Sequence, residues 1–129
     1  MCRNCSQNKW VNNAQNFLQN SNNRDIKYHT VDYLLNHANN GNGACGINNR
    51  VPIEDILTYL RSLNFNVTRE EFQQGTLIQL KQKGIVATLI YPGPQGGVFI
   101  PCSENEIIQV ANQVIDRVIS ELEHLRALL

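Results

Sequence analysis

The stretch that decides the fold covers residues 52–103 and reads PIEDILTYLRSLNFNVTREEFQQGTLIQLKQKGIVATLIYPGPQGGVFIPCS. Apolar residues spaced three and four apart predict a helix over about 52–63, and Pro52 suits its first turn, where a missing N–H does no harm. A second helix is predicted over 68–84. Thr68 and Glu71 have the spacing of a capping box at its start, and Gly84 can end it. In these two helices, Leu63 and Thr76 are expected to face inward with the other apolar positions.

A β-hairpin is predicted after the second helix. Two runs rich in β-branched residues, 85–91 and 98–101, flank a glycine- and proline-rich turn over 92–97. Ser103 and Glu106 then form a second capping-box pattern. This pattern predicts a last helix from Glu104 to Leu129, about 39 Å long at ~1.5 Å per residue.

The last helix carries an unbroken apolar seam. Its members alternate in steps of three and four residues, the spacing of a coiled coil. A domain of this size cannot cover so long an apolar face alone, so we expect a second copy of the chain to pair with it as a homodimer. The predicted dimerisation residues are Ile108, Ala111, Ile115, Val118, Leu122, Leu125 and Leu129.

Three further elements are predicted before Pro52. Helical stripes indicate helices over about 9–19 and 24–39, and the Asn- and Gly-rich run 39–43 breaks the chain after the second of them. The short run 44–47 is predicted to form a minimal strand. The resulting organisation is an N-terminal arm and helix (1–23), a central domain (24–103) and a C-terminal dimerisation helix (104–129).

Composition limits the class of protein. The chain has 129 residues, 42% of them hydrophobic, and no net charge, which fits one folded domain. Charge is unevenly spread, because residues 1–102 carry three more basic than acidic side chains and residues 103–129 carry three more acidic ones. A mildly basic body is compatible with nucleic-acid binding. No apolar run reaches the ~18 residues of a membrane span, and no apolar leader is seen, so we expect a cytoplasmic protein without membrane contact.

The cysteines leave two interpretations open. Cys2 and Cys5 form a CxxC, half of a zinc site, which the fold could complete with Cys45, Cys102 or a histidine. In the simpler interpretation, Cys2 and Cys5 lie on a loose arm while Cys45 and Cys102 are small buried side chains. Disulfides are not expected in a cytoplasmic protein, and no cofactor is required.

Enzymatic chemistry is not indicated. The three histidines, His29, His37 and His124, have no nucleophile or carboxylate pattern beside them that would indicate a catalytic group. The glycines of 93–97 lack the Lys-Ser/Thr ending of a phosphate-binding loop, and neither GxSxG nor HExxH occurs. We therefore expect a protein that is not an enzyme.

The order of the central elements resembles the winged helix-turn-helix superfamily. Helix 24–39, strand 44–47, helices 52–63 and 68–84 and hairpin 85–101 follow one another as in that superfamily, with Thr68 as a cap and Gly84-Ile85 at the exit into the wing. The resemblance implies a mainly α fold, double-stranded DNA as partner, a role in transcription regulation, and Thr68–Lys83 as the recognition helix. The DNA-binding residues that it implies are Arg50, Thr68, Arg69, Gln73, Gln74 and Lys81, with Arg61 as a further phosphate contact.

Two features of the sequence depart from DNA-binding winged-helix proteins and keep other functions open. The wing tip over 93–97 has no Arg or Lys, and the chain is neutral overall. Both features also suit a winged-helix domain that serves as a protein-interaction or assembly subunit. A third hypothesis is a metal- or redox-responsive regulator in which Cys2 and Cys5 are thiolate ligands.

Overall fold

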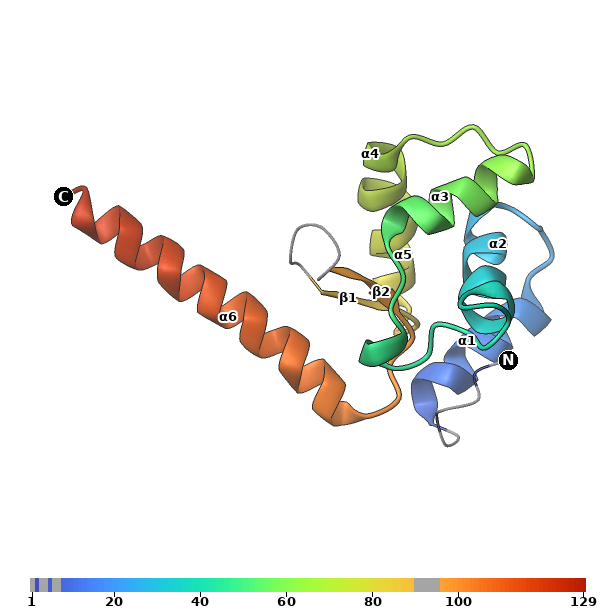
Figure 1. The fold of residues 1–129 in the computed structure, drawn as a ribbon, viewed down its shortest axis with the longest axis horizontal. Coiled ribbons are helices and arrows are strands. Elements are labelled where there is room, and N and C mark those ends of the chain that lie inside the picture. Colours follow the sequence, from blue (N-terminus) through green and yellow to red (C-terminus); the bar gives the residue numbers. More distant parts are fainter. Residues whose placement is uncertain (1, 3–4, 6–7, 90–95) are drawn as a thin grey trace.

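The computed structural model describes residues 2, 5, 8–89 and 96–129. It confirms a mainly helical fold with a small antiparallel hairpin and a long C-terminal helix (Figure 1). None of its described helices combines the length and the apolar character that a bilayer crossing requires. The elements are α1 (Lys9–Asn20), α2 (Ile26–Asp32), the π-helical turn η1 (Tyr33–His37), the 3₁₀ turn η2 (Ile47–Asn49), α3 (Ile53–Ser62), α4 (Arg69–Glu71), the π-helical turn η3 (Phe72–Thr76), α5 (Leu77–Gln82), β1 (Ala87–Leu89), β2 (Gly97–Phe99) and α6 (Glu104–Ala127).

The helix predicted over 68–84 exists as a continuous run of α4, η3 and α5. Its capping box is confirmed, because the Thr68 hydroxyl accepts a hydrogen bond from the Glu71 N–H (3.1 Å) and the Glu71 carboxylate accepts one from the Thr68 N–H (3.4 Å). The π-helical turn in its middle holds one residue more than an α-turn. The next buried side chain after Phe72 is consequently Leu77, and Thr76, expected inside, is only half-buried.

The core lies where α2 and η1, α3 and the α4–α5 helix meet. Leu34, Ile56, Leu60, Phe72 and Leu80 are fully buried within it. Leu63 was expected to join them, and this prediction is wrong: its side chain is 38% exposed. α3 ends at Ser62, and the left-handed backbone of Asn64 (φ 70°) then turns the chain away from the core.

The hairpin pairs β1 with β2 in the register Ala87–Phe99, Thr88–Val98 and Leu89–Gly97. The strand predicted over 44–47 is reduced to one bridge, in which Cys45 lies parallel to Ile100. The turn η2 then reverses the chain, so that Val51 pairs antiparallel with Val98. The predicted turn residues 92–95 lie outside the described part of the chain.

The root of α6 is fixed to the body by Glu106. The capping box expected at Ser103 is wrong, because the Ser103 side chain makes no capping hydrogen bond. The Glu106 carboxylate instead accepts hydrogen bonds from the N–H groups of Cys102 (2.7 Å) and Ile47 (2.8 Å). Ile107 and Val110 pack against the hairpin, and beyond them the helix projects away from the body (Figure 1).

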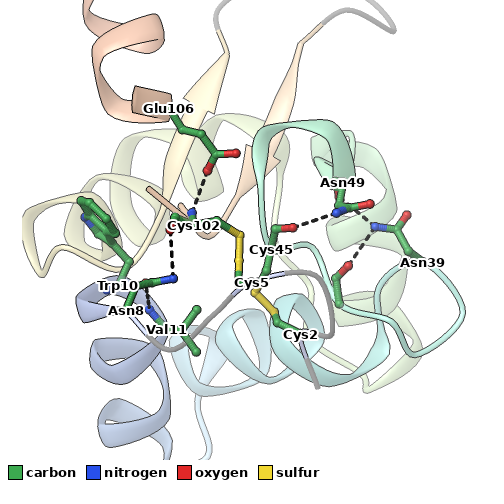
Figure 2. Close-up of a disulfide and its surroundings, with 11 residues drawn as sticks. Cys2, Cys5, Asn8, Trp10, Val11, Asn39, Cys45, Asn49, Cys102 and Glu106 are labelled. Carbon is green, nitrogen blue, oxygen red and sulfur yellow. Dashed lines mark hydrogen bonds between the residues drawn. A yellow bond between two sulfur atoms is a disulfide. The ribbon is translucent and has the colours of Figure 1, made fainter. Parts of the chain in front are cut away.

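All four cysteines are paired, which contradicts the expectation that disulfides would not form. Cys2 is bonded to Cys45 and Cys5 to Cys102, with Cα–Cα distances of 5.5 Å and 5.3 Å. Figure 2 shows the two pairs in one region of the molecule. Cys2 and Cys5 are therefore not on a loose arm: they attach the start of the chain to segments that come 43 and 97 residues later.

We expect Glu106→Ala to lower the free energy of unfolding by about 2 kcal/mol, because it leaves two N–H donors without their charged acceptor. Urea denaturation followed by circular dichroism measures the loss. Glu104→Ala is the matched control: it removes the same charge from the same helical turn, and its cost should stay below about 1 kcal/mol. Equal losses for the two variants would show that Glu106 contributes only its charge.

Candidate nucleic-acid interface

The α4–α5 helix buries one face and exposes the other. Phe72, Leu77 and Leu80 point into the core. The residues predicted to contact DNA from this helix and its cap are all exposed: Thr68, Arg69, Gln73, Gln74 and Lys81. A continuous polar surface with donors and acceptors therefore runs along the outer side of the helix.

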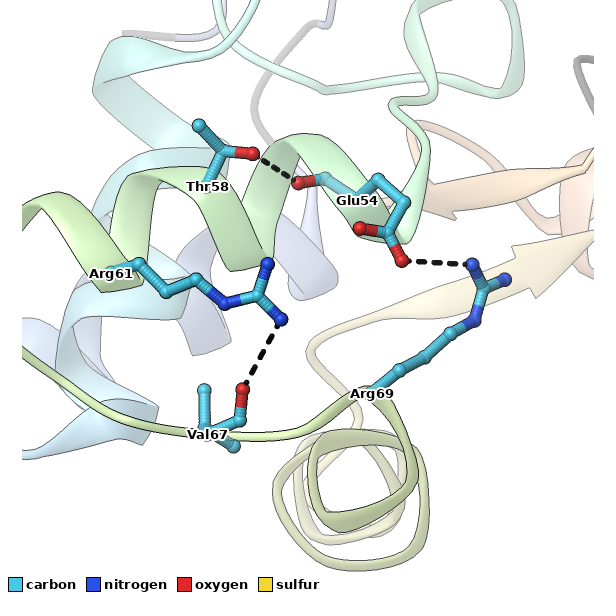
Figure 3. Close-up of polar contacts among 5 residues, drawn as sticks. All are labelled: Glu54, Thr58, Arg61, Val67 and Arg69. Carbon is cyan, nitrogen blue, oxygen red and sulfur yellow. Dashed lines mark hydrogen bonds and ion pairs between the residues drawn. The ribbon is translucent and has the colours of Figure 1, made fainter.

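Arg69 is held by an acidic partner on the preceding helix. Its guanidinium lies 3.1 Å from the Glu54 carboxylate of α3 (Figure 3). Both side chains are more than half exposed, 54% and 56%, so water screens this ion pair and its contribution to stability is small. Glu54 holds the Arg69 guanidinium at the outer surface. Another anion can replace Glu54 as the partner of Arg69 at little cost in free energy.

The other side chains of this surface differ in how strongly they are engaged. The Thr68 hydroxyl is occupied by the capping box. The Gln74 side-chain amide donates to Glu70 (3.4 Å), whereas the Gln73 side chain makes no hydrogen bond to another described residue. Partial desolvation by its neighbours lowers the pKa of Lys81, although the residue remains exposed overall.

The side chains of the two predicted phosphate contacts, Arg50 and Arg61, donate to backbone carbonyls. Arg50 is half-buried beside Gly97 of β2, and its guanidinium donates to the Ile47 carbonyl (2.8 Å). Arg61 donates to the Val67 carbonyl (3.5 Å) in the turn between α3 and α4 (Figure 3). Arg61 therefore lies near the start of the α4–α5 helix, while Arg50 belongs to the hairpin side of the domain.

The apolar seam of α6 is exposed along its whole length. No residue of this helix is buried, and Ile115, Val118, Leu122 and Leu125 are each more than half exposed. Ile108 and Leu129 are exposed as well, as is Ala111, so every predicted dimerisation residue faces solvent in the single chain. Val114, Ile119 and Leu128 widen the seam.

The histidines do not join the cysteines. His37 lies 3.1 Å from Asp32, and His29 packs against Phe65 with its Nδ1 buried and without a partner in the described residues. Outside the paired cysteines, no three side chains of the described residues are placed to hold a metal ion. The sequence did not reveal that Glu54 would pair with Arg69, 15 residues later, because no local pattern signals that contact. It did single out Glu106, but as the partner of Ser103, and the bond that Glu106 accepts from the N–H of Ile47 comes from 59 residues earlier in the chain.

Comparison with known proteins identifies a relative. The chain is 46% identical over 130 residues to a protein of Methanocaldococcus jannaschii named as a control protein, C.MjaVP, and the match covers 96% of this chain and 76% of that protein. No protein-family model matches the sequence, and no solved structure matches it. Because the identity is high and extends over most of both chains, this protein belongs to the family of the control protein C.MjaVP.

Proposed function

We propose that this protein is a dimeric transcriptional regulator of the winged-helix type, which reads double-stranded DNA with the α4–α5 helix. The observation that carries the proposal is the exposed outer face of that helix, with Arg69 and Gln73 directed away from a core formed by Phe72 and Leu80. The relative named as a control protein supports a role in regulation.

The chemistry of this face suits base reading. An Arg guanidinium can donate two hydrogen bonds to guanine, and a Gln amide can pair with both polar groups at the major-groove edge of adenine. Arg69 and Gln73 lie one turn apart near the beginning of the helix, the part that enters the major groove in helix-turn-helix proteins. Arg61 at the neighbouring turn is suited to a phosphate.

Self-association through α6 would present two such helices together. The exposed seam offers a continuous apolar strip that a second copy can cover. Two copies related by a twofold axis would place their α4–α5 helices on half-sites about one helical turn, ~34 Å, apart. A pseudo-palindromic target sequence follows from this symmetry.

Arg69 and Glu54 should have opposite effects on DNA binding. Arg69→Ala should weaken binding to a selected target sequence by about tenfold or more, as expected for the loss of one bidentate base contact. Glu54→Gln should strengthen binding, because it releases Arg69 and removes a negative charge next to the phosphates. Fluorescence anisotropy with a DNA sequence selected from a random pool, at several salt concentrations, measures both effects.

The control for this pair is Lys9→Ala, which removes the same charge as Arg69→Ala from α1, where the ammonium lies over the Trp10 ring. It should leave binding nearly unchanged. Binding that is absent for the unaltered protein, or that does not weaken as salt rises, would refute the DNA-binding proposal.

The dimer is tested separately by a substitution within the seam. Leu122→Glu places a charge on the apolar strip and should convert a dimer into a monomer, as measured by sedimentation equilibrium. Glu121→Gln, one residue away and also exposed, should leave the dimer intact. A monomeric unaltered protein would contradict the proposed self-association.

One observation favours a second candidate function, a protein-interaction or assembly subunit. Glu54, Glu70 and Glu71 are exposed around the start of the α4–α5 helix, where they would repel phosphates. Under this alternative, the unaltered protein would ignore DNA in the anisotropy measurement and would co-purify with a basic protein partner instead.

A further inference from the structure

We propose that Cys2, Cys5, Cys45 and Cys102 together bind one zinc ion in the reduced protein. The proposal concerns a different part of the molecule from the helix that we propose reads DNA, and it stands whether or not the protein binds DNA. It rests on the convergence of four sulfur atoms from three separate segments of the chain, and on the backbone that surrounds them.

The four sulfur atoms converge because of the fold. Cys2 and Cys5 are three residues apart, the spacing at which one turn of chain offers two thiolates to the same ion. Cys45 and Cys102 are brought together by the parallel bridge of Cys45 to Ile100, two residues before Cys102. The pairs Cys2–Cys45 and Cys5–Cys102 then join both halves, and Figure 2 shows the four side chains facing one region.

Cys45 has a glycine close to it on each side in the sequence, Gly43 and Gly46. Gly43 and Gly46 have left-handed backbones, with φ of 88° and 93°. A Cβ at Gly43 would come within 2.9 Å of the Cys2 sulfur, and one at Gly46 within 3.3 Å of the Cys102 sulfur. The sulfur atoms of Cys2 and Cys102 therefore both lie close to the backbone that flanks Cys45, where a side chain at Gly43 or Gly46 would crowd them.

The chemistry of the donors selects zinc. Four thiolates are a closed tetrahedral set, typical of a structural zinc site, with Zn–S distances of about 2.3 Å. In that geometry, neighbouring sulfur atoms are roughly 3.8 Å apart. The paired Cα atoms already lie 5.3–5.5 Å from each other, so the side chains need only a small movement to reach this sulfur–sulfur separation. Soft thiolate ligands also disfavour magnesium and calcium, which prefer oxygen.

The backbone of the ligands is held by neighbouring polar groups. The Asn8 amide donates to the Cys102 carbonyl (3.2 Å), and the Asn49 amide donates to the Cys45 carbonyl (2.8 Å). Glu106 accepts from the Cys102 N–H (2.7 Å), as Figure 2 shows. Such outer contacts fix the direction of metal ligands. A zinc ion here would lock the N-terminal arm, the loop before η2 and the root of α6 to one another.

Metal content tests the proposal directly. The full chain is expressed with zinc and purified with a thiol-free reductant and no chelator. Inductively coupled plasma mass spectrometry should then find about one zinc ion per chain. After exchange with cobalt(II), the protein should show the intense visible bands of tetrahedral cobalt and the near-ultraviolet sulfur-to-cobalt absorption. Less than about a tenth of an equivalent of zinc, together with the absence of these bands, would overturn the proposal.

Serine variants distinguish a shared ion from two separate crosslinks. Each of Cys2→Ser and Cys5→Ser should abolish stoichiometric zinc, whereas the adjacent control Ser103→Ala should keep it. In proteins purified with the same thiol-free reductant and no chelator, where neither crosslink forms, the double variant Cys2→Ser/Cys5→Ser should lose as much thermal stability as either single variant and no more, because all three lack the same ion. Additive losses for the two substitutions, or zinc retained by the serine variants, would refute the site.

Discussion

The structure depends on the hydrogen-bonding groups of one short segment, residues 98–106. Main-chain groups cannot be buried without partners, and here the partners come from distant parts of the chain. Val98 exchanges two hydrogen bonds with Val51, Ile100 bonds to Ala44 and Gly46, and Cys102 bonds to Asn8 and Glu106. The hairpin, the loop around η2, the N-terminal arm and the root of α6 are all located by this segment. The helical core then packs on one side of it, and the projecting part of α6 leaves on the other.

Features that depend on local sequence could be predicted. The Thr68–Glu71 capping box, the helices of the core and the antiparallel hairpin all follow from residues a few positions apart, and all are confirmed. Features that depend on distant residues could not. Glu106 has the right spacing to cap with Ser103, but the N–H of Ile47, 59 residues earlier, offers a second donor that only the fold brings near. The cysteines likewise pair across separations of 43 and 97 residues.

In the proposed interface, too, local features could be predicted from the sequence and contacts between distant residues could not. Periodicity correctly assigned Arg69 and Gln73 to the exposed side of their helix, because burial of Phe72 and Leu80 leaves no other orientation. Periodicity could not show that Glu54, 15 residues before Arg69, would hold that guanidinium at the surface. The resemblance to winged-helix proteins implied Arg50 as a further DNA contact, and in the structure its guanidinium donates to the Ile47 carbonyl beside η2. Contacts between elements thus decide which exposed charges can act together.

The π-helical turn η3 has a consequence for the direction of the side chains that follow it. A regular α-helix rotates by about 100° per residue, so twelve regular steps would turn Lys81 roughly 120° away from Arg69. The extra residue in η3 reduces that rotation by about 100°, which leaves the side chains of Arg69 and Lys81 within about 20° of each other around the helix axis. By the same geometry Gln73 lies about 40° from Arg69, so Arg69, Gln73 and Lys81 share one exposed face of the helix. A single-residue deletion within 72–76 would restore the regular helix and break that alignment, even if all three side chains were kept.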